Sequence, residues 1–161
     1  MKNRKVFLFS FDSVNSSMVA GLRMYYLKAY LDERNFDATL ICESGTESEG
    51  VDVSVPLRKI FKSRYLRYLI GLLIFPDFTS LWSFKVYNSS SVPKVLDKLS
   101  APVIITSGPP FGVHWIGLLY KKNLGSMRWI VDMRDPFTLN GGYNKNKVRR
   151  IFDRYFENKV F

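Results

Sequence analysis

Two short segments of the sequence end in residues that can bind a ligand or move a proton. Each segment begins with an apolar run, and the runs stop abruptly at Ser107 and at Asp132. An apolar run that ends in small or charged residues is typical of a buried parallel strand that delivers a loop to a cleft. We therefore expect the chemistry of this protein at the ends of these two strands.

The second segment carries two carboxylates and a guanidinium close together. Asp132 and Arg134 flank Met133 and so point to the same side of a strand, whereas Asp135 enters the turn at Pro136. A carboxylate here can accept a proton from a hydroxyl group, and an arginine can hold a phosphate or a carboxylate. We expect Asp135 to act as the base, with Arg134 as its electrostatic partner. An Arg–Asp pair that only stabilises the loop is the alternative.

The first segment predicts a narrow turn followed by a helix. Pro109 and Pro110 fix the backbone, and the helix is expected to begin near Phe111 with free N–H groups directed at the cleft. The alternative is that these residues only form the start of the helix and bind no ligand. His114, the only histidine, lies one turn into this helix, where it is either a packed side chain or an acid–base catalyst.

A third polar loop follows the first apolar run of the chain. Residues 12–17 are polar, and Ser16 or Ser17 is expected to cap the next helix. The same serines and the helix N-terminus could instead present donors to an anion.

Strand and helix patterns alternate along the whole chain. The expected strands are residues 6–11, 38–42, 51–55, 103–106 and 129–133, and the main expected helices are residues 18–34, 113–122 and 144–161. This alternation predicts an α/β fold: a Rossmann-like parallel sheet with helices on both faces and right-handed crossovers. The last helix is expected to be amphipathic, with these apolar residues on one face: Val148, Ile151, Phe152, Tyr155 and Phe156.

Length and composition indicate one cytosol-facing domain, residues 1–161. A chain of this length can bury a core but not two. The single cysteine, Cys42, excludes an internal disulfide and any multi-cysteine metal site. The apolar run after the basic N-terminus breaks at Ser10, which is too early for a signal peptide.

The net charge of +10 predicts anionic partners. Residues 57–75 form a basic and strongly apolar helix candidate, and its uncharged run, residues 69–75, is too short to span a bilayer. Either this helix contacts an anionic membrane, which would place the protein peripherally on the inner face of the cell membrane, or its basic face is merely solvated. The candidate membrane contacts are Lys59, Lys62, Arg64 and Arg67. Nucleic acid is not an expected partner, because no helix-turn-helix, RRM or zinc-finger pattern organises the charge.

The order of these motifs resembles the N-terminal half of family 4 glycosyltransferases with the GT-B fold. The resemblance lies in the S-x-P-P turn at residues 107–110 and the D-x-R-D-P strand end at residues 132–136. Pro76, Asp77 and Trp82 are similar to the P-D-x-x-x-x-W region of the sugar-polymer enzymes in that family. The chain departs from the family in its first loop, which lacks the usual glycine pair.

The resemblance implies an acceptor-binding domain that works with a second, nucleotide-sugar-binding domain not included in these residues. The complete enzyme would move a sugar from a nucleotide-sugar donor to a polysaccharide or lipid-linked acceptor, with retention and without a cofactor or metal, and this chain alone would be inactive. The implied acceptor-side residues are Arg23, Ser107, Gly108, Pro109, Pro110 and Phe111. Two alternatives remain open: a non-catalytic membrane-associated subunit that recruits a separate donor-binding chain, and a small anion-binding α/β protein.

Overall fold

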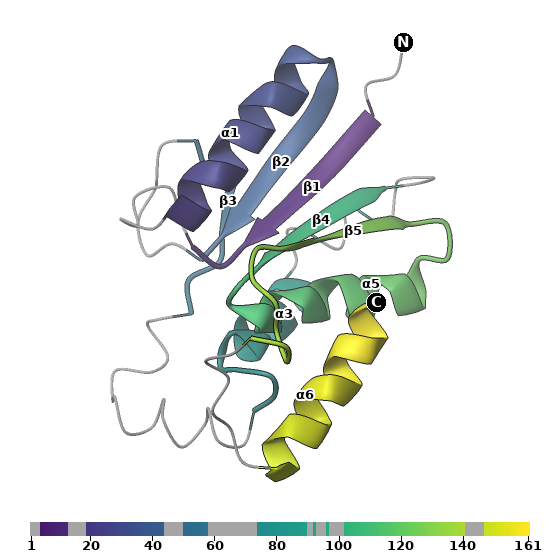
Figure 1. Cartoon of the computed structure of the whole chain (residues 1–161). Coiled ribbons are helices and arrows are strands. Elements are labelled where there is room, and N and C mark those ends of the chain that lie inside the picture. Colours follow the sequence, from purple (N-terminus) through teal and green to yellow (C-terminus); the bar gives the residue numbers. More distant parts are fainter. Residues whose placement is uncertain are drawn as a thin grey trace.

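The computed structural model confirms the α/β fold, with five parallel strands in the order β3-β2-β1-β4-β5 (Figure 1). It describes residues 4–12, 19–43, 50–57, 74–89, 92, 96, 102–140 and 147–161. The strands are β1 (Arg4–Ser10), β2 (Phe36–Cys42), β3 (Val53–Ser54), β4 (Val103–Gly108) and β5 (Arg128–Met133). The helices are α1 (Val19–Glu33), α3 (Thr79–Tyr87), the short 3₁₀ helix η1 (Phe111–His114), α5 (Trp115–Asn123) and α6 (Lys147–Val160).

The expected elements agree with these positions, except that β3 is shorter than residues 51–55. The basic helix candidate lies mostly in residues 58–73, outside the described residues. No helix in the described part of the chain is long and apolar enough to cross a membrane.

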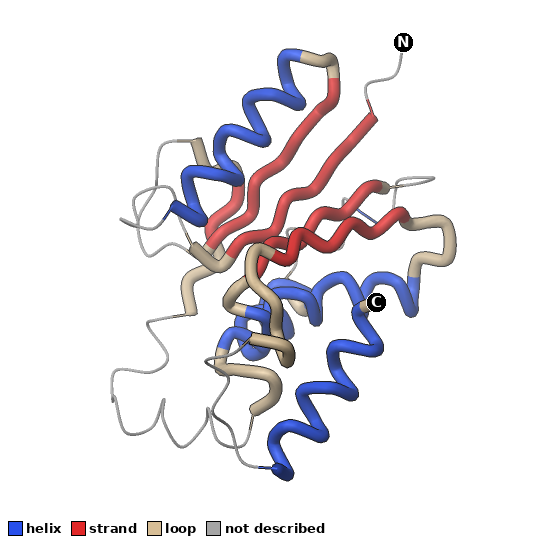
Figure 2. Tube along the Cα trace, in the orientation of Figure 1, coloured by secondary structure: helices blue, strands red, loops and turns tan. Residues whose placement is uncertain are grey.

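Helix α1 covers one face of the sheet, as Figures 1 and 2 show. Met24 of α1 is fully buried against alternate residues of the two central strands, which include Val6, Leu8, Leu40 and Cys42. Successive residues of a strand point to opposite faces, so this layer uses only half of each strand. Burial raises the pKa of the Cys42 thiol to about 12, which leaves it protonated and inert.

Helices α3 and α5 cover the other face (Figure 2). Phe9 and Ile104 of the sheet pack there against Trp82 and Ile116, and all four side chains are fully buried. The Trp82 indole also donates a hydrogen bond of 2.9 Å to the carbonyl oxygen of Val55. Trp82, in the P-D-x-x-x-x-W region, is thus a core residue that ties α3 to the segment after β3.

Helix α6 packs beside α5 with an unexpected face inward. Asp153, Phe156 and Val160 are buried, and the rings of Phe156 and Trp115 lie 5.1 Å apart. Of the five apolar residues expected on one face of the helix, only Phe156 is buried, and the other four are exposed. The last helix therefore forms where expected but is rotated relative to a simple apolar-inward packing.

Candidate functional site

The candidate site lies where the chain changes direction within the sheet. From β1 the chain proceeds outward to β2 and β3, and it then returns to place β4 on the other side of β1. In open α/β sheets, ligands bind beyond the carboxyl ends of the strands at such a switch point. We call the region beyond the ends of β1, β4 and β5 the strand-end site.

Sheet register brings the polar ends of three strands together. Ser10 of β1 pairs with Ser107 of β4, which in turn pairs with Asp132 of β5. The Ser107 hydroxyl donates a hydrogen bond of 2.8 Å to Oδ2 of Asp132. The two chemistry-bearing segments of the sequence are therefore direct neighbours, as strand ends in a parallel sheet require.

Arg23 of α1, the helix that covers the same face of the sheet, completes this cluster. Its Nη2 lies 2.9 Å from Oδ1 of Asp132 and forms a salt bridge with it. The Arg23 side chain is 57% exposed, whereas that of Asp132 is only 19% exposed. Because a guanidinium has five N–H donors, Arg23 can bind Asp132 on one side and meet an anion from solvent on the other.

Arg134 holds the turn after β4. Its backbone N–H and its Nε donate to the carbonyl oxygen of Gly108 at 2.9 and 3.2 Å, and its Nη2 donates to the carbonyl oxygen of Pro109. The same guanidinium lies 4.0 Å from the carboxylate of Asp12, two residues after β1 ends. Arg134 thus fixes the S-x-P-P turn to β1 and β5, which is a loop-stabilising role made through carbonyl groups rather than through Asp135.

Asp135 lies apart from this cluster. It is exposed, and it makes no hydrogen bond or ion pair with any residue that the structure describes. Its availability at the rim is compatible with the expected contact to a hydroxyl group, and its role as a base stays a prediction.

The helix after the turn does not present all of its N–H groups to the cleft. The N–H of Gly112 donates to Oδ2 of Asp77 at 3.1 Å, and Oδ1 of Asp77 accepts from the N–H of Thr79 at 2.9 Å. One carboxylate therefore caps both α3 and η1. The expectation of free N–H groups is wrong for Gly112, because a carboxylate from a distant segment already accepts its proton.

Pro109, Pro110 and Phe111 form the half-buried wall of the turn. The Phe111 ring stacks on Phe137 with ring centroids 4.2 Å apart. Gly108 has no room for a side chain, since a Cβ atom there would lie 2.7 Å from Nε2 of His114. The turn is therefore narrow, as expected, because the imidazole of His114 packs against Gly108.

His114 lies behind the turn rather than in the open cleft. It is fully buried, and its Nδ1 lies 2.8 Å from Oγ1 of Thr106, which also accepts a 2.9 Å bond from the Trp129 indole. The pKa of His114 is lowered from 6.5 to about 3, chiefly by burial; the charge of Asp132 opposes this shift, and the guanidinium of Arg134 contributes to it. At neutral pH His114 is a neutral imidazole that supports the turn, and this enclosure favours the packed role over acid–base catalysis.

Sequence reasoning missed Asp77 and Asp12 as parts of this arrangement. Asp77 precedes Thr79 at the start of a helix, and an aspartate in that position is a recognisable capping signal. Its second bond, to Gly112, is long-range and leaves no local signal. The membrane-contact candidates Lys59, Lys62, Arg64 and Arg67, and the capping candidates Ser16 and Ser17, lie outside the described residues. Among the described residues, no three histidine, cysteine, aspartate or glutamate side chains gather as a metal site.

Comparisons with protein-family models, with curated proteins and with solved structures found no match to this chain. The motifs and the geometry of the strand-end site are therefore the features that bear on the function of this chain.

Proposed function

We propose that this chain is the acceptor-binding domain of a glycosyltransferase of the GT-B, family 4 type. The complete enzyme would transfer a sugar from a nucleotide-sugar donor to a polysaccharide or lipid-linked acceptor at the cytoplasmic face of the membrane. The observation that carries the proposal is the cluster of Arg23, Ser107 and Asp132 at the switch point of a parallel sheet. The proposal is further supported because the two motifs that resemble the family, at residues 107–110 and 132–136, lie beside one another at this site.

The cluster suits an acceptor that carries both hydroxyl and phosphate groups. The exposed part of Arg23 can meet a phosphate, as a lipid-linked sugar would present. Asp132 is engaged at both oxygens, so it is suited to orienting a hydroxyl group through Ser107 and Arg23. Asp135 is exposed at the rim and is the proposed contact for the hydroxyl that receives the sugar.

Acceptor binding can be tested on the chain by itself. A short-chain prenyl diphosphate sugar, titrated into labelled protein, should shift the backbone amide signals of Arg23, Ser107 and Asp132. Arg23→Ala removes a charge-assisted contact and should weaken binding by about tenfold to a hundredfold. Arg128→Ala is the matched control, because Arg128 is exposed at the amino end of β5, the end opposite the site. Equal affinity of Arg23→Ala and the control variant would contradict the proposed site.

The same titration separates the alternatives. Inorganic phosphate binding as tightly as the lipid-linked sugar would favour a small anion-binding protein. Turnover is tested separately in a mixture with a nucleotide-sugar-binding partner chain, where Asp135→Asn should abolish transfer and leave acceptor binding unchanged. A complex that binds acceptor and partner but shows no transfer with any donor would favour the recruiting subunit.

A further inference from the structure

The outward face of α6 carries a continuous apolar stripe. Val148, Ile151, Phe152 and Tyr155 follow one another at i, i+3, i+4 and i+7, the spacing of a single helix face. Their exposed fractions are 65%, 68%, 54% and 61%, and that of Phe161 just beyond the helix is 78%. Single exposed apolar residues are ordinary, but an ordered stripe on one helix indicates a surface that another body covers.

All the exposed charges of α6 have one sign. The exposed charged residues of this helix are Lys147, Arg150, Arg154 and Lys159. Its two acidic residues turn away from this surface: Asp153 is buried, and the carboxylate of Glu157 accepts hydrogen bonds from the N–H and hydroxyl of Thr138. The outward face is thus apolar in its centre and uniformly basic beside it.

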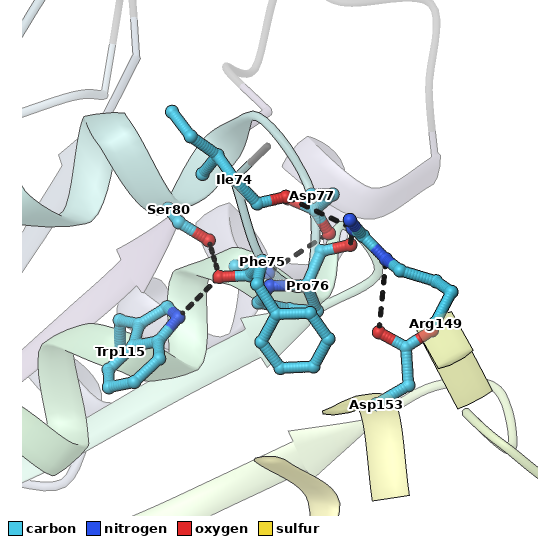
Figure 3. Close-up of polar contacts among 9 residues, drawn as sticks. Ile74, Phe75, Pro76, Asp77, Ser80, Trp115, Arg149 and Asp153 are labelled. Carbon is cyan, nitrogen blue, oxygen red and sulfur yellow. Dashed lines mark hydrogen bonds and ion pairs between the residues drawn. The ribbon is translucent and has the colours of Figure 1, made fainter. Parts of the chain in front are cut away.

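The orientation of α6 is held by contacts on its inner side (Figure 3). Nη2 of Arg149 donates to the carbonyl oxygens of Ile74, at 3.0 Å, and Pro76, and its Nε lies 3.6 Å from Oδ1 of Asp153. The Phe75 ring contacts Phe156 with centroids 5.8 Å apart. Rotating the apolar stripe inward would break these bonds and expose Phe156, so the stripe stays outside.

We propose that this outward face of α6 docks on an anionic lipid bilayer. Aromatic and aliphatic side chains beside lysine and arginine, with no exposed acid, are what a helix lying in a charged membrane interface requires. The chain's net charge of +10 adds long-range attraction to such a surface. A second copy of this chain fits poorly, because two α6 faces meeting across an interface would bring basic residues together without an acidic counterpart. The surface supports the peripheral location in the proposed function, but it is separate from the strand-end site.

Vesicle flotation tests the charged part of this surface. The chain should float with phosphatidylcholine vesicles that contain phosphatidylglycerol, and not with pure phosphatidylcholine vesicles. Lys147→Gln with Arg154→Gln should lower the partition coefficient by about 30-fold, since each basic residue near an anionic surface contributes about a fivefold change. Lys122→Gln with Arg128→Gln is the matched control, because both pairs lower the net charge from +10 to +8 and both control residues are exposed outside α6. An equal loss in both double variants would overturn the proposal by showing that only net charge matters.

A second pair of variants tests the apolar stripe. Ile151→Ser with Tyr155→Ser should weaken vesicle binding by at least about tenfold, because their apolar area leaves the lipid. Leu22→Ser with Tyr26→Ser, at exposed positions of α1, should leave vesicle binding unchanged. Circular dichroism and melting curves establish that the α6 variants are folded, so that a loss of binding reports the surface itself.

Three further results would identify what covers the outward face of α6. Binding that survives both α6 double variants and is lost when Lys59, Lys62, Arg64 and Arg67 are neutralised would move the membrane contact to that segment and overturn the proposal. A dimer that Ile151→Ser disrupts, without vesicle binding, would identify a second copy as the occupant. Arg23→Ala should leave vesicle binding intact, and the α6 variants should leave acceptor binding intact. Failure of the proposed function and failure of this inference are therefore distinguishable.

Discussion

His114 should make the stability of this protein sensitive to acid, and His114→Asn should remove that sensitivity. The imidazole is fully buried, and burial lowers its pKa from 6.5 to about 3. Between these two values the unfolded chain binds a proton that the folded chain does not. A depressed folded-state pKa gives a contribution that is complete above the unfolded pKa and is lost as pH falls.

The size of the effect follows from the difference in proton binding. Between its pKa of 6.5 and about pH 5, a span of about 1.5 pH units, the histidine of the unfolded chain is protonated and that of the folded chain is not. Each pH unit is worth about 1.4 kcal/mol, so the free energy of unfolding of the wild type falls by about 2 kcal/mol between about pH 7.5 and about pH 5. Asparagine keeps an acceptor near the position of Nδ1 for the Thr106 hydroxyl but does not titrate. The variant should be less stable than the wild type at about pH 7.5, owing to lost packing, and this deficit should shrink by about 2 kcal/mol at about pH 5.

Urea unfolding followed by tryptophan fluorescence at the two pH values measures the deficit directly. Because other titrating groups are common to both proteins, their contributions cancel in the comparison. As the only histidine, His114 also gives a single imidazole signal in NMR spectra, which should not titrate between about pH 5 and about pH 8. A deficit that is equal at both pH values, or an imidazole that titrates near 6.5, would refute the reasoning.

Three further predictions concern packing and charge. Gly117→Ala should destabilise the fold by about 2 kcal/mol, because its Cβ would lie 1.9 Å from Cε2 of Trp129; Gly125→Ala, with nothing within 4 Å, is the control in thermal melts. Asp153→Asn should show the reverse pH trend to His114→Asn. Burial raises the pKa of Asp153 from 3.8 to about 7, so the wild type loses stability as the pH rises from about 4 toward 7. The variant should not lose this stability, and urea titrations measure the difference. Asp77→Ala should cost about 2 kcal/mol in the same urea assay, since it leaves two helix N-termini without their acceptor.

The sequence was sufficient to predict the sheet and the place of the strand-end site. Buried parallel strands are nearly continuous apolar runs, so the runs before Ser107 and Asp132 marked β4 and β5 with their polar ends. Parallel strands in one sheet end at the same edge, which is why separate motifs could be expected to meet. The specific pairing of Ser107 with Asp132 required the register, and that is set by packing over the whole sheet rather than by either motif.

Contacts between distant segments could not be predicted in this way. The bond from Gly112 to Asp77 joins residues 35 positions apart, and that from Arg149 to Ile74 joins residues 75 positions apart. Both end on backbone groups, which are present in every residue and so leave no trace in the sequence. They nevertheless decide whether an N–H faces the cleft and which side of α6 faces inward.

Helix α6 shows that apolar periodicity alone does not decide which face of a helix packs inward. The pattern of apolar residues predicts an amphipathic helix correctly, but it contains no information on the hydrogen bonds that partly buried carbonyl groups need. Near α6 the carbonyls of Ile74 and Pro76 need donors, and Arg149 can supply them only if its side of the helix is turned inward with Asp153. Once that side is buried, Ile151 and Tyr155 must face outward, because they lie on a different face of the helix. The exposed stripe is therefore a consequence of satisfied polar groups inside the fold, and the membrane assay asks whether the protein also uses it.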